Sequence, residues 1–191
     1  MKKIVSGVAL LLAACASAPT DEEISAQALK SLKASFRERG QARLDRLDQD
    51  ETQRICSARA PDKAQLERVE KLNQAALRYP ADGRLMGDWR EGEKIAQSGV
   101  GKQFSDNPKA PAGGNCYACH QLSRQEISFG TIGPSLLGYG KLRGNSEAIQ
   151  RYTYGKVYNS QAFSACSNMP RYGHTGILEQ ALKACELYTL P

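Results

Sequence analysis

Apolar residues recur with the spacing of an amphipathic helix in two stretches of the N-terminal part of the chain. Each stretch places four such residues on one helical face: Ile24, Ala28, Leu32 and Phe36 in the first, and Leu66, Val69, Leu72 and Ala76 in the second. Pro61 and Asp62 mark the start of the second helix, since proline suits a first turn and an acidic residue suits its positive end. Both stripes are narrow, so we expect these helices to pack on the following domain or on a partner.

From about residue 80 onward, short helical patterns alternate with loops rich in glycine. The helical patterns are GDWREGEKIAQSG, then GNSEAIQRYTYGKVY with a polar start at Asn145 or Ser146, and finally GILEQALKACELYTL. Alternating strand patterns and internal repeats are absent from the sequence. The sequence therefore predicts an all-α protein with a charged helical extension, residues 15–79, ahead of a small helical domain, residues 80–191.

The beginning of the chain has the pattern of an export signal. Two lysines near its start precede an apolar segment that is too short to cross a bilayer. The run LAAC, which ends at Cys15, resembles a bacterial lipobox, in which cleavage precedes the cysteine and acylation anchors the mature protein. We therefore predict a signal peptide at residues 1–14 and a lipid on Cys15. Ordinary cleavage after Ala16–Ala18 is the alternative, although Pro19 directly after that site is poorly accepted.

The stretch GGNCYACHQ contains Cys116, Cys119 and His120, which form the Cys-x-x-Cys-His pattern of covalent haem c attachment. This spacing lets both thiols reach the porphyrin vinyl groups while the imidazole that follows binds the iron. A zinc site would need a second ligand pair at short spacing, and a thioredoxin-like pair would need a strand-helix context. A chance match on a structural disulfide is the remaining alternative. We predict one haem c, whose attachment outside the cytoplasm agrees with an exported, periplasmic chain.

A haem held by His120 raises the question of the second iron ligand. Met169, His174 and Met86 are the candidates, and Met169 is favoured because a neutral thioether suits an electron carrier held at fairly high potential. Met86 precedes the first helix of the domain, where packing explains it better, and His174 remains the alternative ligand. Small cytochromes c also need a carbonyl that accepts the Nδ1 proton of the proximal imidazole. The expected acceptor is Pro134.

The charge of the chain excludes one class of partner and permits another. The formal net charge is +6, from 26 basic and 20 acidic residues, and no basic block interleaves with aromatic residues. Nucleic-acid binding is therefore not expected. A mildly basic surface can instead guide an acidic protein partner, with an encounter rate that depends on ionic strength.

Three blocks, NCYACHQL, GPSLLGYGK and CSNMPRYGH, occur in this order. Over about residues 79–176 the chain resembles the SoxX family, the monohaem cytochrome subunits of the SoxAX complex of bacterial sulfur oxidation. The resemblance implies a class I cytochrome c-like domain, with Cys116 and Cys119 as thioether anchors and His120 and Met169 as axial iron ligands. Family members usually have a longer C-terminal tail, so this chain is not expected to make the contacts of that tail.

The resemblance also implies a division of labour. In this family the SoxA partner carries the active-site haem and a cysteine that joins thiosulfate oxidatively to the SoxYZ carrier. The present chain would be the non-catalytic, electron-accepting subunit of that heterodimeric thiosulfotransferase and would pass electrons to a downstream cytochrome. Its residues agree, since no nucleophile or general base accompanies the haem motif. A self-sufficient, membrane-tethered electron shuttle is the alternative, and a purely structural haem is a third hypothesis.

Three cysteines remain after the haem anchors and Cys15 are assigned, which is an odd number for an oxidising compartment. Cys166 lies close to Met169, and Cys56 lies in the extension, which would gain most from a covalent tie. We favour a Cys56–Cys166 disulfide, and the resemblance supports this choice because longer members of the family carry a cysteine in both places. A bridge between Cys166 and Cys185 is the alternative.

Overall fold

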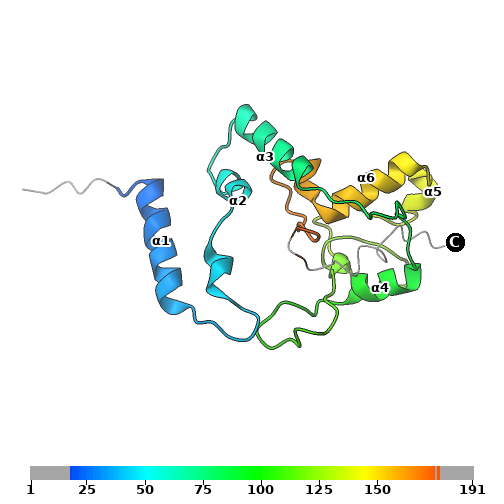
Figure 1. Ribbon diagram of the computed structural model, residues 1–191, viewed down its shortest axis with the longest axis horizontal. Coiled ribbons are helices and arrows are strands. Elements are labelled where there is room, and N and C mark those ends of the chain that lie inside the picture. The colour runs from blue at the N-terminus through cyan, green and yellow to red at the C-terminus, as the bar shows by residue number, and fades with distance from the viewer. Residues whose placement is uncertain (1–17, 175, 177–191) are drawn as a thin grey trace, which may run out of the picture. The chain divides into compact units, whose positions relative to one another are not determined.

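The structure is a computed structural model that describes residues 18–174 and 176 (Figure 1). The chain divides into two compact units, Met1–Phe36 and Arg37–Pro191. We describe each unit by itself. Cys15 and Cys185 lie outside the described residues, as does the helix predicted for GILEQALKACELYTL.

The described part of the first unit is dominated by helix α1 (Asp21–Ser35). Thr20 caps this helix and forms a capping box with Glu23, whose carboxylate accepts the Thr20 N–H at 2.8 Å. The predicted helix is therefore confirmed, and local signals explain where it begins. No residue of α1 is buried, and Ile24 and Leu32 on its apolar face are 50% and 41% exposed.

The second unit contains short helices joined by long loops. Its α-helices and 3₁₀ turns, in chain order, are η1 (Leu44–Leu47), α2 (Glu51–Cys56), α3 (Lys63–Ala75), α4 (Trp89–Gln97), η2 (Cys116–Ala118), α5 (Tyr139–Arg143), α6 (Glu147–Tyr158) and η3 (Ser160–Ala162). The described residues contain no strand, only an isolated bridge between Arg39 and Ala42. The helical stretches predicted around α3, α4 and α6 are confirmed.

Side-chain caps set the starts of the longer helices. Asp62 caps α3 by accepting the Gln65 N–H at 2.8 Å, so Pro61 lies just outside the helix rather than in its first turn. Asp50 caps α2 in the same way through Gln53. Ser146, one of the two predicted starts, caps α6. Each cap satisfies a backbone N–H that the helix leaves without an intrahelical partner.

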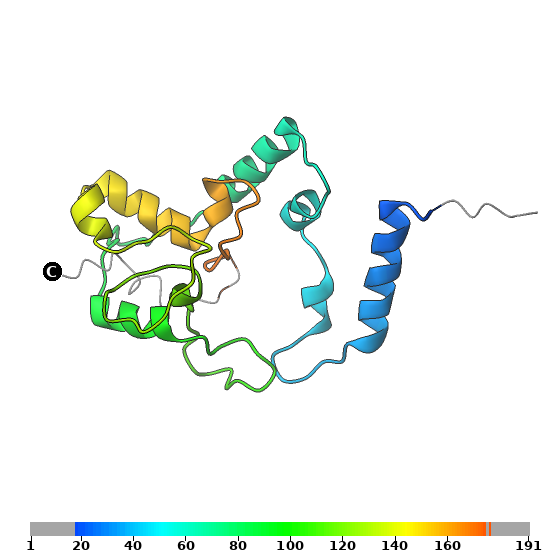
Figure 2. The same ribbon diagram turned by 180° about the vertical axis from the view of Figure 1, so that it is seen from behind.

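A buried polar network joins α2 and α3 to the turn after α6. Asn73 on α3 donates to the Thr52 hydroxyl at 3.0 Å, and Asn159 donates to the Asn73 side-chain oxygen at 2.8 Å. Asn159 is fully buried and Asn73 is 2% exposed, so these amides satisfy one another away from water. Figures 1 and 2 show α3 beside η3 accordingly.

Residues of the predicted extension after Phe36 therefore belong to the second unit. The composition of the sequence changes near residue 79, whereas the two compact units meet between Phe36 and Arg37. One reason is that the segment just after the boundary is tied to a distant loop. Arg46 donates to the Lys102 carbonyl at 2.6 Å, and the Arg39 guanidinium lies 4.4 Å from the centre of the Phe104 ring.

Two small apolar clusters form the core of the second unit. One surrounds Leu85 and Tyr154, and partly buried side chains from α4, α6 and the loops pack on it. The other contains Ala96, Tyr117 and Leu122, with Cys116 and Leu136 packed against it. This second cluster holds η2 against α4 and so positions the cysteine motif (Figure 1).

Candidate functional site

The cysteine motif begins in a tight turn that is held against α4. Asn115 adopts a left-handed backbone conformation with φ of 47°, and its N–H donates to the Ser98 carbonyl at 2.9 Å. Beyond it, the N–H groups of Cys119 and His120 both donate to the Cys116 carbonyl, at 3.1 and 2.9 Å. Cys116 begins the resulting 3₁₀ turn and Cys119 follows its last residue, and both side chains are half-buried.

His120 has a defined orientation. Its Nδ1 lies 2.7 Å from the Pro134 carbonyl oxygen, which is the acceptor expected from the sequence. A carbonyl only accepts hydrogen bonds, so Nδ1 carries the proton and Nε2 keeps a lone pair that can bind a metal. A Cβ on Gly133 would lie 2.1 Å from the Cε1 atom of the ring, so only glycine permits this close approach.

Backbone hydrogen bonds hold the segment that follows against the motif. The Gly130 N–H donates to the Tyr117 carbonyl at 2.8 Å, and the Gly133 N–H donates to the Cys119 carbonyl at 2.9 Å. Gly130 also needs to be glycine, because a Cβ there would meet the Ala118 oxygen at 1.8 Å. The first residues of the GPSLLGYGK block therefore lie against the His120 ring.

Large apolar side chains are exposed within and just before the segment that these hydrogen bonds hold. Ile127 is fully exposed, Ile132 is 74% exposed and Phe129 is 41% exposed. All three lie within a few residues of Gly133, which contacts the His120 ring. Exposing several such side chains in one short segment is unfavourable unless something apolar covers them. A porphyrin held by the neighbouring thiols would provide apolar surface of this kind.

Tyr117 adds a second observation at the motif. Its side chain is 7% exposed, and among the described residues its hydroxyl is buried without a hydrogen-bond partner. A buried hydroxyl without a partner is costly, so this position suits a polar group supplied from outside the described residues. A haem carboxylate would meet this need, because it accepts hydrogen bonds and the Tyr117 hydroxyl can donate one.

The loop that carries Met169 is connected to the cysteine motif. The Met169 carbonyl accepts the buried Ser160 hydroxyl at 2.6 Å. Three residues later, the Tyr172 hydroxyl donates to the Gly114 carbonyl at 2.5 Å, two residues before Cys116. The two segments that carry the predicted axial ligands are therefore joined, although about fifty residues separate them in sequence.

His174 and Met86 are the alternatives to Met169 as the second iron ligand, and neither lies in the same surroundings as Met169. The Nε2 atom of His174 lies 3.7 Å from a carboxylate oxygen of Asp50. Burial, together with the nearby Arg171 guanidinium, lowers the pKa of His174 below its usual value, although Asp50 opposes the shift. Met86 lies in the loop before α4 and is 43% exposed.

A disulfide joins Cys56, the last residue of α2, to Cys166, whose Cα lies 5.2 Å away. This is the favoured pairing of the sequence analysis. Cys166 adopts a left-handed backbone conformation with φ of 56°, which directs the chain into the Met169 loop. The bridge therefore links the N-terminal extension covalently to the segment that carries the candidate thioether ligand.

An ion pair that sequence reasoning missed lies beside this disulfide. Arg171 donates to the Asp50 carboxylate at 2.7 Å, and the arginine side chain is only 9% exposed. Burial opposes the shift, but the Gln53 N–H and the Arg171 guanidinium together hold the pKa of Asp50 below its usual value. The arginine within MPRYG was the available signal, but no pattern linked it to an aspartate 121 residues earlier.

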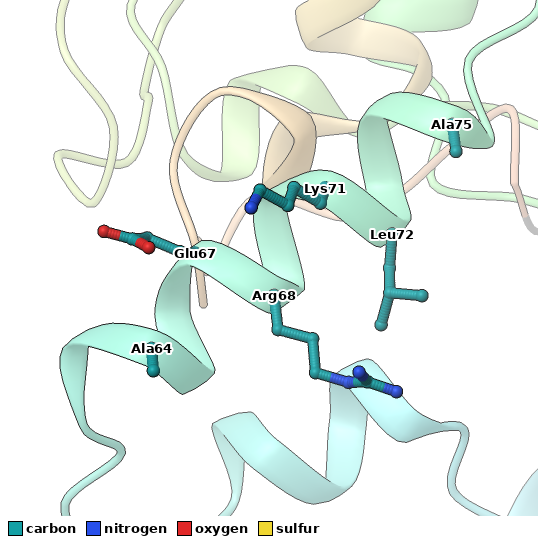
Figure 3. Close-up of a pocket in the computed structure, with 6 residues that line it drawn as sticks. All are labelled: Ala64, Glu67, Arg68, Lys71, Leu72 and Ala75. Atoms are coloured by element: carbon teal, nitrogen blue, oxygen red, sulfur yellow. The ribbon is translucent and has the colours of Figure 1, made fainter.

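The molecule also has a shallow hollow along α3, away from the cysteine motif (Figure 3). Figure 3 shows Arg68 pointing toward α2, where it pairs with Glu51 at 2.5 Å, while Leu72 lies on the same face. No side chain of the cysteine motif lines this hollow. Within the described residues, no three His, Cys, Asp or Glu side chains form a group that could hold a metal ion.

Comparison with known proteins links the chain to a lipoprotein. It is 38% identical over 136 residues to an uncharacterized lipoprotein of Aquifex aeolicus (strain VF5). The match covers 68% of this chain and 63% of the relative, so the chain spans less than two thirds of the relative's length. No family model matches the sequence. The relative's description agrees with the lipobox interpretation of Cys15 and with a lipoprotein held at a membrane.

Proposed function

We propose that the chain is a monohaem cytochrome c that accepts electrons from a SoxA-type subunit during thiosulfate oxidation. One observation carries the haem part of this proposal: the His120 imidazole, which directly follows the Cys-x-x-Cys pair, donates its Nδ1 proton to the Pro134 carbonyl. The exposed apolar side chains at positions 127, 129 and 132 support it further.

Four side chains of the chain would hold the haem. Cys116 and Cys119 would form the two thioether bonds, and His120 and Met169 would be the iron ligands. When bound, haem c supplies reversible one-electron chemistry. Because Pro134 fixes the His120 tautomer, the imidazole presents Nε2 to the metal without reorientation. With two of its own side chains as iron ligands, the chain would conduct electrons and leave substrate chemistry to its partner.

The sulfur chemistry belongs to the proposed partner. Joining thiosulfate to a carrier thiol forms a sulfur–sulfur bond and releases two electrons and a proton. Because haem c supplies one-electron chemistry, this subunit would take up the two electrons in turn and pass each to a downstream cytochrome. The NCYACHQL, GPSLLGYGK and CSNMPRYGH blocks support the assignment to the SoxAX complex.

The alternative is a membrane-tethered electron shuttle that works without a SoxA partner, and the similarity to a lipoprotein agrees with either version. In both versions Cys15 would carry acyl chains in the periplasm. No helix in the part of the chain that the structure describes is long and apolar enough to span a membrane. Cys15→Ala should release the protein from membrane fractions or leave the leader uncut.

The test begins with the chain expressed with haem c maturation factors and exported. A pyridine haemochrome spectrum and intact mass should show one covalent haem, and Cys116→Ala with Cys119→Ala should abolish it. Absence of covalent haem in the wild-type protein would overturn the whole proposal.

The partner is tested by pull-down from the native host with haem staining of the bound proteins. Tight co-purification with a second haem protein, and thiosulfate-dependent reduction of the pair only, supports the SoxAX assignment. A stable monomer that exchanges electrons with several acceptors supports the shuttle instead.

A further inference from the structure

The Met169 loop is fastened to α2 on both sides of the methionine. Cys166, three residues before Met169, is bonded to Cys56 at the end of α2. Arg171, two residues after Met169, pairs with Asp50, the residue that caps the start of α2. A helix of six residues thus holds the loop at two points, one covalent and one ionic.

The two carboxylate oxygens of Asp50 accept hydrogen bonds from different partners. One oxygen accepts the Gln53 N–H at 2.8 Å and begins α2, while the other accepts the Arg171 guanidinium at 2.7 Å. Because the Arg171 side chain is almost buried, loss of the carboxylate charge would leave a poorly solvated cation beside the loop. The loop would then be free to move the arginine toward water.

The backbone N–H and carbonyl of Met169 are held by hydrogen bonds to neutral groups. Its carbonyl accepts the Ser160 hydroxyl at 2.6 Å, and its N–H donates to the Ser167 hydroxyl at 3.2 Å. Charge-assisted hydrogen bonds are stronger than neutral ones, so the arginine contact is a major restraint on the C-terminal side of the methionine.

We propose that the Asp50–Arg171 ion pair positions Met169 for iron ligation, an inference that rests on the proposed function. Asp50 is a positioning residue, because it acts through Arg171 and does not touch the thioether. The N-terminal extension would therefore set how firmly the distal ligand is held, and through it the reduction potential.

The chain offers a matched control. Asp50 and Asp62 both begin a helix through a capping box with a glutamine, but only Asp50 contacts Arg171. Asparagine caps helices about as well as aspartate, so Asp50→Asn and Asp62→Asn both keep the cap. They differ in whether a charge beside the Met169 loop is lost.

The measurement is titration of the ferric full-length holoprotein with imidazole, which binds the iron only when the thioether has left. We expect Asp50→Asn to bind imidazole about tenfold more tightly than wild type, because a hydrogen bond to a charged group is lost. The weak far-red absorption of the iron–thioether bond should weaken, and the midpoint potential should fall. Asp62→Asn should match wild type in all three measurements.

Equal imidazole affinity and unchanged far-red absorption in Asp50→Asn would overturn the inference while leaving the haem assignment intact. Absence of covalent haem in the wild-type protein, seen in the haemochrome spectrum, would overturn both. Should Asp50→Asn fail to accumulate, Arg171→Lys replaces it, since lysine keeps the charge but loses the planar fork. Tighter imidazole binding in Arg171→Lys supports the inference, and wild-type affinity contradicts it.

Discussion

Helices α1 and α3 have similar sequence patterns but differ in how far their side chains are buried. Both are amphipathic and charged, and both begin with a capping box. Helix α1 has no buried residue, whereas α3 buries Val69 completely and Asn73 almost completely. The difference shows that a narrow apolar stripe does not by itself decide burial. Distant residues supply buried partners to α3, such as Asn159, whose side-chain amide donates to the Asn73 side-chain oxygen.

The largest effect should come from removing the covalent tie of the α2–α3 region. Replacing Cys56 and Cys166 together with alanine should lower the free energy of unfolding of the second unit by about 4 kcal/mol, because the bridge closes a loop of 110 residues. Urea denaturation measures the loss, and dithiothreitol should reproduce it in the wild-type protein only. A loss below about 1 kcal/mol would show that the extension is held by other contacts.

A smaller effect should follow from disrupting the buried amides. Asn73→Leu removes the partner of both the Thr52 hydroxyl and the Asn159 amide, and each such orphaned group costs about 1–3 kcal/mol. We expect the unfolding midpoint in urea to fall by the equivalent of about 3 kcal/mol. Gln27→Leu, a matched change on exposed α1, should alter stability by less than about 0.5 kcal/mol. Equal effects of the two substitutions would erase the distinction between the helices.

The helix caps sharpen the comparison further. Asp62→Ala should lower the global free energy of unfolding by about 1 kcal/mol, because α3 unfolds with the second unit. Thr20→Ala removes an equivalent cap but should reduce only helical content, which circular dichroism detects, and local amide protection in α1. If Thr20→Ala shifts the global transition as much as Asp62→Ala, α1 is more strongly coupled to the rest than its exposure indicates.

The smallest expected effect is on acid stability. The pKa of Asp50 is lower in the folded chain than in the unfolded one, so its contribution is complete above the ordinary aspartate pKa of about 3.9. It is lost as the pH falls below that value through the lower folded pKa. Stability measured by denaturation at pH 5 and pH 3 should therefore fall more in wild type than in Asp50→Asn. Since Asp50 is partly exposed, we expect a difference below about 1 kcal/mol. An equal loss of stability between pH 5 and pH 3 in wild type and in Asp50→Asn would contradict this expectation.

Much of the local architecture could be predicted from the sequence. Helical periodicity and caps located α1, α3, α4 and α6, because these signals act within a few residues of each other. The Cys-x-x-Cys-His motif likewise named the thiols and imidazole of the candidate site, and knowledge of what a haem-bound imidazole needs pointed to Pro134. The amino-acid composition changes near residue 79, but it did not indicate that the compact units meet between Phe36 and Arg37, because that division depends on contacts between distant segments.

By itself, the sequence predicted which residues would carry the chemistry, since the thiols and the imidazole of a Cys-x-x-Cys-His motif are recognisable by type and spacing. Only the tertiary structure decided how distant segments restrain them. The Asp50–Arg171 pair and the Asn73–Asn159 contact join residues 121 and 86 positions apart. No local periodicity encodes such pairs, because they form only where folding has buried both partners and each must satisfy the other.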